Sequence, residues 1–365
     1  MDGPRRLLLT GLLVILLVVV IEALVGIVVL PRFAVDIEIP LRAADRWVAG
    51  QAPYLADAFK AAPGVDLPFL YPPFTLPFLA ALDVVPRGLV DAAGVAGLLA
   101  CGILACRRLA IPWPWVPLVI AWPPFSEGIF SGNVQIALFA AFACLVFRPG
   151  GLPWRPRPRD LSDGGTSGAL IGGLSTLIGA IKITQPHAWV FALRHRWRAA
   201  LAGAIVAGVI VLATLPLTGI GAWWDWLAQL RLANDPAWEP GGIALSRYLP
   251  NGVGLAIAAV CVAAIPFVPW RSAGAWIGLL SVVGSLSLHT FGLLFLLPAM
   301  LVIRREIAIL VAILIATYTL EGTWAGIAVC AVAFVASTRW PGLREPALAG
   351  GSVDAGTDLR WARPA

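Results

Sequence analysis

The chain has 365 residues, of which 59% are hydrophobic and 13% are charged, and its formal net charge is +6. Soluble domains carry about 25% charged residues, so this composition excludes an ordinary soluble protein and predicts an integral membrane protein. The positive charge does not indicate a nucleic-acid partner, because the arginines cluster in short segments between apolar runs, as in cytoplasmic loops of membrane proteins.

The first predicted element is a membrane span at residues 7–30, an almost uninterrupted apolar run. At about 1.5 Å per residue the run is long enough to cross ~30 Å of hydrocarbon. Arg5 and Arg6 precede it, which predicts a cytoplasmic N-terminus and an external segment from Pro31 onward. Asp36 and Glu38 follow directly, so we expect two carboxylates in the first external loop, at the outer membrane surface.

The next segments read as interfacial or incomplete helices. Residues 41–48 separate an apolar face from a charged face at helical spacing, which predicts a helix lying at the membrane surface. Residues 223–230 show a similar pattern of tryptophans and leucines. Prolines at positions 72, 73 and 77 predict a broken or partial helix at 69–82, because proline removes backbone donors and clashes within a helical turn.

The centre of the chain leaves too few residues for two full crossings between its arginine clusters. Residues 168–193 therefore predict a hairpin of two short helices that turns at 182–186 and places Lys182 deep, near the outer side. An external loop is predicted for 218–252, and it contains Arg247. His289 is expected at the outer surface, between two further apolar segments.

These segments predict an all-α polytopic membrane protein with about 10–12 transmembrane or re-entrant helices and an external first loop that carries short interfacial helices. Residues 1–340 form the predicted membrane domain, and residues 341–365 form a flexible cytoplasmic tail. We therefore expect a multi-pass protein of the cell membrane, with both termini in the cytoplasm and its polar site outside.

On this topology several polar side chains gather at the external face. Carboxylates and cations at a lipid–water boundary suit transfer from a lipid-linked phosphate: a carboxylate can take the proton of an acceptor hydroxyl while cations stabilise the departing phosphate. An ionisable residue in apolar surroundings costs about 2.5–3.5 kcal/mol on insertion scales. Lys182 lies in such surroundings, which makes it a candidate functional residue. The set comprises Asp36, Glu38, Asn133, Gln135, Lys182, Arg247 and His289.

Structural explanations for the same residues stay open. On position alone, Asp36 is equally consistent with a solvated loop acid, and Lys182 with a side chain that reaches to the membrane surface. His289 alone is typical of a satisfied interface residue. Glu38 fits a loop or interface residue better than a second catalytic group. The sequence has no paired histidines at metal-ligand spacing and no glycine-rich phosphate loop, so we predict no metal site and no cofactor.

Several motifs resemble one known family. Asp36, residues 43–44, Gly50, Pro53–Tyr54 and the run Phe-Leu-Tyr-Pro-Pro-Phe at 69–74 resemble the start of glycosyltransferase family 87. The likeness continues in order through Gly132–Asn133, Lys182, Pro186 and residues 194–198 to His289, and covers residues 30–305. Those proteins are membrane mannosyltransferases of the GT-C superfamily that use polyprenyl-phosphate mannose. This chain departs from the family pattern at Pro40–Leu41 and at residues 244–246, before Arg247.

The resemblance implies a GT-C-like bundle and a role for each matching position. Asp36 matches the general base near the start of the first external loop, and Lys182, His289 and Arg247 match cations near the donor phosphate. Substrate contacts are implied for Tyr54, Tyr71, Asn133, Gln135 and Glu38. The implied partners are a polyprenyl-phosphate sugar, a lipid or glycan acceptor and membrane lipids.

Two other classes remain as alternatives. A lipid or solute transporter would also have many spans, but it is typically built from repeated halves, and no internal repeat is evident. A noncatalytic membrane scaffold predicts that Asp36, Lys182 and His289 do not converge.

Overall fold

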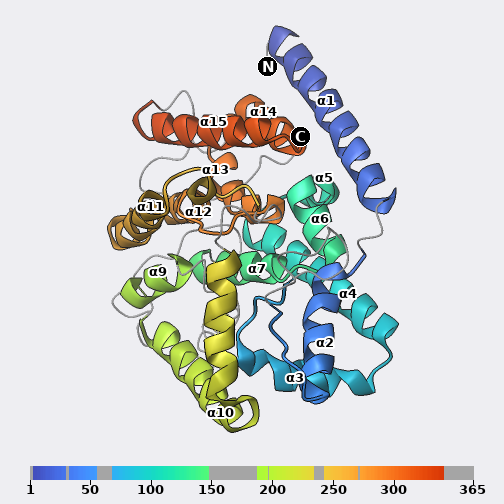
Figure 1. The fold of residues 1–365 in the computed structure, drawn as a ribbon. Coiled ribbons are helices and arrows are strands. Elements are labelled where there is room, and N and C mark those ends of the chain that lie inside the picture. The colour runs from blue at the N-terminus through green and yellow to red at the C-terminus, as the bar shows by residue number, and fades with distance from the viewer. Residues whose placement is uncertain are drawn as a thin grey trace.

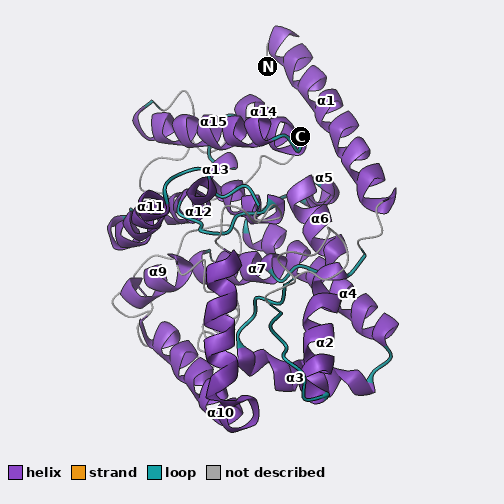
Figure 2. Cartoon of the chain, viewed as in Figure 1, coloured by secondary structure: helices purple, strands orange, loops and turns teal. Residues whose placement is uncertain are grey.

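The computed structural model describes residues 3–29, 33–55, 68–147, 187–195, 197–233, 242–269 and 272–340, and helices dominate this part of the chain (Figure 2). The predicted all-α fold of a polytopic membrane protein is confirmed. The α-helices are α1 (Gly3–Val29), α2 (Val35–Val48), α3 (Leu76–Ala81), α4 (Arg87–Arg108), α5 (Val116–Ala121), α6 (Pro123–Ser131), α7 (Gln135–Val146), α9 (His187–His195), α10 (Trp197–Ala233), α11 (Asn251–Ala264), α12 (Ala273–Val283), α13 (Leu297–Met300), α14 (Arg305–Ala316) and α15 (Leu320–Arg339). The 3₁₀ turns are η2 (Pro73–Thr75), η3 (Leu82–Val84), η4 (Trp113–Trp115), η5 (Leu245–Arg247), η6 (Ile265–Phe267) and η8 (Thr290–Leu296).

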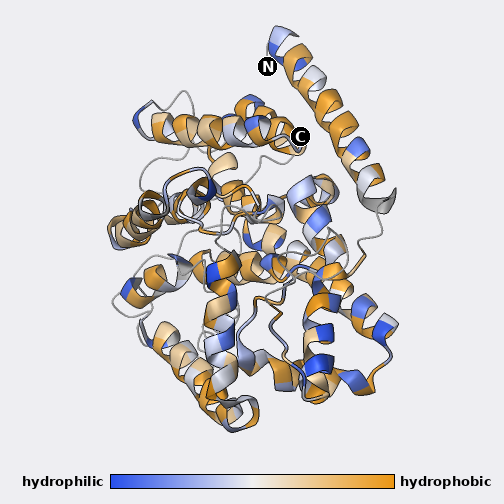
Figure 3. Cartoon of the chain, viewed as in Figure 1, coloured by the Kyte–Doolittle hydropathy of each residue, from blue (hydrophilic) through white to orange (hydrophobic). Residues whose placement is uncertain are grey.

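Four helices of the described chain are long and apolar enough to cross a membrane: α1, α4, α10 and α15. Figure 3 shows α1 as hydrophobic along most of its length and standing at the edge of the molecule. Its apolar side chains are largely exposed, with Leu7 at 78% and Val18 at 58%. Such exposure is unfavourable in water and favourable in hydrocarbon, so the helix corresponds to the span predicted at 7–30.

The main core lies between α6, α7, α12 and η8, near the centre of Figure 1. Phe139 of α7 packs edge-on against Phe125 of α6 and Phe295 of η8, with ring centroids 5.8 and 5.4 Å apart. Edge-to-face contacts between fully buried rings fix helix positions well, because the ring edges carry partial positive charge that meets the negative ring faces. This packing holds the turn between α6 and α7, residues 131–135, in a rigid frame.

The basic starts of α1 and α14 meet at one end of the bundle. Arg5 of α1 forms a hydrogen-bonded ion pair with Glu306, at the start of α14, and Arg304 lies 3.5 Å from the same carboxylate. In Figure 1, α14 and α15 occupy this end of the molecule, while α2, α3 and the distal part of α10 occupy the opposite end. Asp36 follows the far end of α1, so it lies on the side away from this cluster.

The segment after α1 is helical where a loop was predicted for Asp36 and Glu38. Ala34 adopts a left-handed conformation (φ 55°), and α2 begins directly after it, so both acids lie in the first turn of a helix. The interfacial helix predicted at 41–48 is the second half of α2. The broken helix predicted at 69–82 is confirmed as η2, α3 and η3, which at 12 residues is too short to cross a bilayer.

The loop predicted for 218–252 is also partly helical. Helix α10 continues to Ala233 through a kink at Gly219 (φ 71°, ψ 155°), a backbone conformation that favours glycine. Beyond the kink, the helix packs against η2 and α3. Sequence reasoning ended the apolar run at 217 and placed an external loop from 218 onward, with a surface helix at 223–230. Lys182, most of its predicted hairpin and the tail 341–365 lie outside the described residues.

Candidate functional site

Asp36 is fixed at the corner between α6 and α7. The left-handed turn at Ala34 brings its backbone N–H to the carbonyl of Phe130, at 2.9 Å, so the start of α2 is attached to the end of α6. The side chain of Asp36 then points at the α6–α7 turn. Two residues there donate hydrogen bonds to it, Ser131 through Oγ at 2.7 Å and Asn133 through Nδ2 at 2.9 Å.

Both donors are themselves held rigidly. Ser131 is 7% exposed and Asn133 is 5% exposed. The Oδ1 atom of Asn133 accepts the backbone N–H of Gln135 at 2.9 Å, and the backbone N–H of Asn133 donates to Gly128 at 2.8 Å. We call Asp36, Ser131 and Asn133 the Asp36 cluster. Asn133 was among the predicted substrate-binding residues, whereas its contact here is with the carboxylate.

A glycine makes this close approach possible. Gly132 ends α6 with φ +81°, and a Cβ atom placed on it would lie 2.5 Å from Cγ1 and 2.7 Å from Cδ1 of Ile37. Ile37 is the residue after Asp36, so its side chain occupies the space that a larger residue at 132 would need. The predicted Gly132–Asn133 motif therefore has a structural basis: Gly132 leaves room for Ile37 of α2, and Asn133 donates a hydrogen bond to Asp36.

Tyr71 lies beside the same carboxylate. Burial raises the pKa of the Tyr71 phenol, and the negative charge of Asp36 raises it further, so the hydroxyl stays protonated as a hydrogen-bond donor. Tyr54 donates from its hydroxyl to the Tyr71 carbonyl at 2.8 Å and stacks on Phe69 at 5.3 Å. Tyr54 and Tyr71, both predicted substrate-binding residues, thus form one aromatic wall with Phe69, and Tyr71 is near enough to Asp36 for its charge to act on the phenol.

Sequence reasoning missed the residues that brace this wall from α10. The indole N–H of Trp226 donates to the carbonyl of Leu70 at 2.9 Å, and Gln229 Nε2 donates to the carbonyl of Leu55 at 3.1 Å. Residues 223–230 were predicted as a helix at the membrane surface, but Trp226 is only 7% exposed and packs inside the protein. The amphipathic pattern at 223–230 could have indicated these contacts, because one face of such a helix can pack against protein while the other faces lipid.

His289 and Arg247 lie on two loops that are joined to each other. The backbone N–H of Ile243 donates to the Leu288 carbonyl at 2.6 Å, and Gly242 (φ +77°) lies against the His289 ring. Arg247 follows in η5 of the same loop. His289 stacks on Phe291 at 5.4 Å, and a Cβ placed on Gly128 would lie 3.0 Å from Phe291 Cβ. The loops that carry His289 and Arg247 are therefore linked to each other, and the His289 loop approaches α6 at Gly128, three residues before Ser131.

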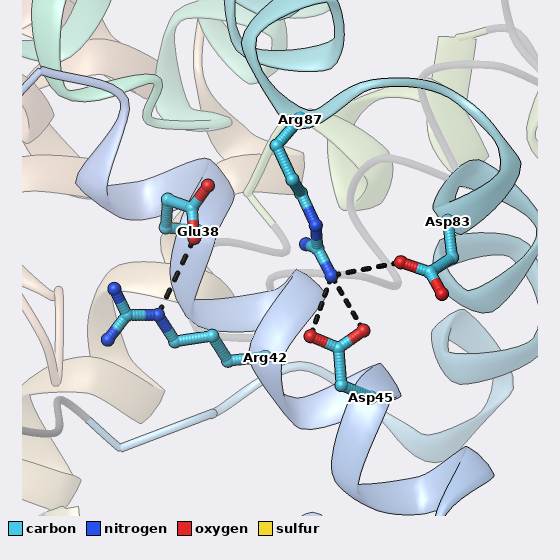
Figure 4. A network of polar contacts seen from close by, with 5 residues as sticks. All are labelled: Glu38, Arg42, Asp45, Asp83 and Arg87. Atoms are coloured by element: carbon cyan, nitrogen blue, oxygen red, sulfur yellow. Dashed lines mark hydrogen bonds and ion pairs between the residues drawn. The ribbon is translucent and has the colours of Figure 1, made fainter.

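Glu38 belongs to a different set of contacts. It pairs with Arg42 at 3.5 Å on the outer face of α2. Figure 4 shows this pair beside a second one, in which Arg87 at the start of α4 donates to both oxygens of Asp45 at 2.6 Å and also contacts Asp83. The Arg87–Asp45 pair ties α2 to α4, whereas Glu38 pairs with Arg42 within α2 itself.

The fold and this site define a class: a helical membrane protein with a carboxylate that Ser131 and Asn133 anchor after its first apolar helix. Among the described residues, no three side chains of the metal-ligating types converge. The sequence profile of glycosyltransferase family 87 matches residues 69–271, more than half of the chain. The chain therefore belongs to glycosyltransferase family 87 and is a membrane glycosyltransferase.

No curated protein and no solved structure matches the chain. The family match contains Tyr71, Asn133, Gln135, Lys182 and Arg247, and it ends before His289. Asp36, Glu38 and Tyr54 precede it. The assignment of Asp36 therefore depends on its position and on its contacts with matched residues.

Proposed function

We propose that this glycosyltransferase transfers a sugar, which we assign as mannose, from a polyprenyl-phosphate donor to a hydroxyl group of a lipid or glycan acceptor. One observation carries the proposal: Asp36 is held by Ser131 and Asn133 directly after the span α1. A carboxylate fixed at the end of a membrane helix meets a donor whose sugar lies at the headgroup level and whose lipid lies in the bilayer.

In this mechanism Asp36 acts as the general base. The acceptor hydroxyl loses its proton to the Asp36 carboxylate as its oxygen forms a bond to the anomeric carbon. The bond from that carbon to the phosphate oxygen breaks on the opposite side, and the polyprenyl phosphate leaves with the electron pair. Attack opposite the leaving group gives a product of inverted anomeric configuration. No covalent enzyme intermediate is involved.

The departing phosphate needs positive charge or hydrogen-bond donors close to it. We assign this role to Arg247 and His289, whose loops are joined at Ile243 and Leu288, and to Lys182. Fixed donors of this kind stabilise the charge that develops on a leaving group, and they do so best where water is excluded.

The remaining contacts of the substrate are assigned to the residues around this centre. Tyr54 and Tyr71 form an aromatic wall beside the base. We also assign substrate contacts to Gln135 at the start of α7 and to Glu38 in the first turn of α2. In our proposal the membrane domain, residues 1–340, carries the reaction at the external face of the cell membrane. We place both termini in the cytoplasm, and the basic residues Arg5 and Arg304, which both contact Glu306 at the other end of the bundle, support this placement.

The donor class can be tested with purified protein in liposomes that contain a lipid and glycan extract of the cell envelope as acceptors. One sample receives polyprenyl-phosphate mannose labelled in the sugar, and the other receives a labelled nucleotide sugar. We expect label in a new product only with the lipid-linked donor, and a product linkage opposite to that of the donor. Transfer from the nucleotide sugar alone, or retention of the donor configuration, would contradict the proposal.

A further inference from the structure

We infer that Ser131 and Asn133 are positioning residues that hold one oxygen of Asp36, Oδ2, and thereby present the other, Oδ1, to the acceptor hydroxyl. This inference deepens the proposed function, in which Asp36 is the base, and it rests on that function. It adds Ser131, which no sequence pattern marked, and it gives Asn133 a role on the enzyme's own carboxylate.

Both hydrogen bonds to the Asp36 carboxylate end on the same atom. Ser131 Oγ and Asn133 Nδ2 donate to Oδ2, at 2.7 and 2.9 Å. A carboxylate oxygen has two lone-pair positions, so two donors occupy Oδ2 fully. Within the described residues Oδ1 accepts no hydrogen bond and takes part in no ion pair. Oδ1 is therefore the atom with acceptor positions left for the proton of a substrate.

The orientation of the Asn133 amide is determined by its other contacts. Its Oδ1 accepts the backbone N–H of Gln135, so its NH₂ group must face the carboxylate. The opposite orientation would place two oxygens against each other and two N–H groups against each other. The amide is thus a fixed donor toward Asp36, and its burial protects the hydrogen bond from competition by water.

Ser131 behaves differently from an ordinary serine in a helix. Such a serine commonly donates back to a carbonyl four residues earlier, as Ser126 of the same helix does to Trp122 at 3.4 Å. Ser131 is the last residue of α6, and its hydroxyl donates out of the helix to Asp36 instead. The distance of 2.7 Å is typical of a charge-assisted hydrogen bond.

Together the two donors restrict both side-chain torsions of Asp36. A base must lie within hydrogen-bond reach of the proton that it removes, and a displacement of about 1 Å can reduce a rate 10²-fold. Loss of one donor leaves the carboxylate in place but lets it rotate. The expected defect is therefore in the chemical step, with donor binding retained.

The test uses purified protein in liposomes with labelled polyprenyl-phosphate mannose. We expect Ser131→Ala to lower kcat about 10-fold and to leave KM for this donor unchanged, whereas Ser131→Thr, which keeps the hydroxyl, restores most of the rate. Asn133→Ala should show the same split between kcat and KM. Ser126→Ala is the matched control, with a serine of the same helix that does not contact Asp36, and it should keep the wild-type rate.

The outcomes separate this inference from the proposed function. If the wild-type protein transfers no label, the proposed function fails. If the wild type is active and Asp36→Asn is inactive, yet Ser131→Ala and Asn133→Ala keep the wild-type kcat, the inference fails alone. A rise in KM with unchanged kcat, or an equal loss in Ser131→Thr and Ser131→Ala, would also overturn it, because either result indicates substrate contact or general disruption.

Discussion

Replacing Gly132 by alanine tests how α2 is seated on the corner between α6 and α7. The new Cβ would lie 2.5 Å from Cγ1 and 2.7 Å from Cδ1 of Ile37, closer than carbon atoms approach in folded proteins. Ile37 must move, and Asp36 is its neighbour in the chain. We therefore expect Gly132→Ala to lower both the stability of the protein and its rate of transfer.

The size of the effect follows from two contributions. Holding a non-glycine residue in the left-handed conformation costs about 1–2 kcal/mol. Overpacking against Ile37 adds typically 1–3 kcal/mol, so the total loss in the free energy of unfolding is about 2–5 kcal/mol. Gly50 is a matched control, since it has a similar φ of +72° and no atom within 4 Å of the position that a Cβ would take. Gly50→Ala should therefore cost only the first contribution, about 1–2 kcal/mol.

The assay is thermal unfolding in detergent together with transfer of label in liposomes. Gly132→Ala should have the lower thermal midpoint of the two variants and the lower rate. In an Ile37→Ala background, which removes the atoms that clash, the additional loss from Gly132→Ala should shrink to that seen at Gly50. Equal losses at Gly132 and Gly50 in the wild-type background would refute the reasoning, because they would mean that Ile37 does not fill this space.

The hydrogen bonds and ion pairs around the site give three further predictions. Trp226→Phe should lose about 1–3 kcal/mol of stability through its missing indole hydrogen bond, whereas the exposed Trp224→Phe should change the thermal midpoint little. A double-mutant cycle of Arg87→Ala and Asp45→Ala should give a coupling energy of about 0.2–1 kcal/mol, and zero coupling would contradict the contact in Figure 4. Burial raises the pKa of Tyr54 in the folded protein, so its contribution to the free energy of unfolding is complete below pH ~10 and is lost as the pH rises above that value. Denaturant titrations at increasing pH should therefore show a smaller loss of stability for Tyr54→Phe than for the wild type.

Composition predicted the membrane class, because hydrophobicity depends on local sequence. The apolar run before Asp36 forms α1, whereas the loop predicted for Asp36 is the first turn of α2. The Gly132–Asn133 motif marked a tight turn, and such a turn is present. These features arise from hydrophobicity and backbone conformation within short segments.

Contacts between distant segments could not be predicted in this way. Ser131 and Asp36 are 95 positions apart, and nothing in an isolated serine at the end of an apolar helix indicates a carboxylate partner. The region 218–252 was predicted as an external loop with a surface helix at 223–230, yet α10 continues to Ala233 and Trp226 is buried against Leu70. Tertiary packing decides both cases.

The central claim is that Asp36 removes the proton of the acceptor, and its most direct test is the transfer rate of Asp36→Asn. Purified variant and wild-type protein are supplied with labelled polyprenyl-phosphate mannose, and Asp83→Asn, an exposed acid near the same helix, serves as control. We predict a loss of about 10²- to 10⁴-fold for Asp36→Asn, a wild-type rate for Asp83→Asn and similar thermal midpoints for all three proteins. Full transfer by a folded Asp36→Asn variant would contradict the account.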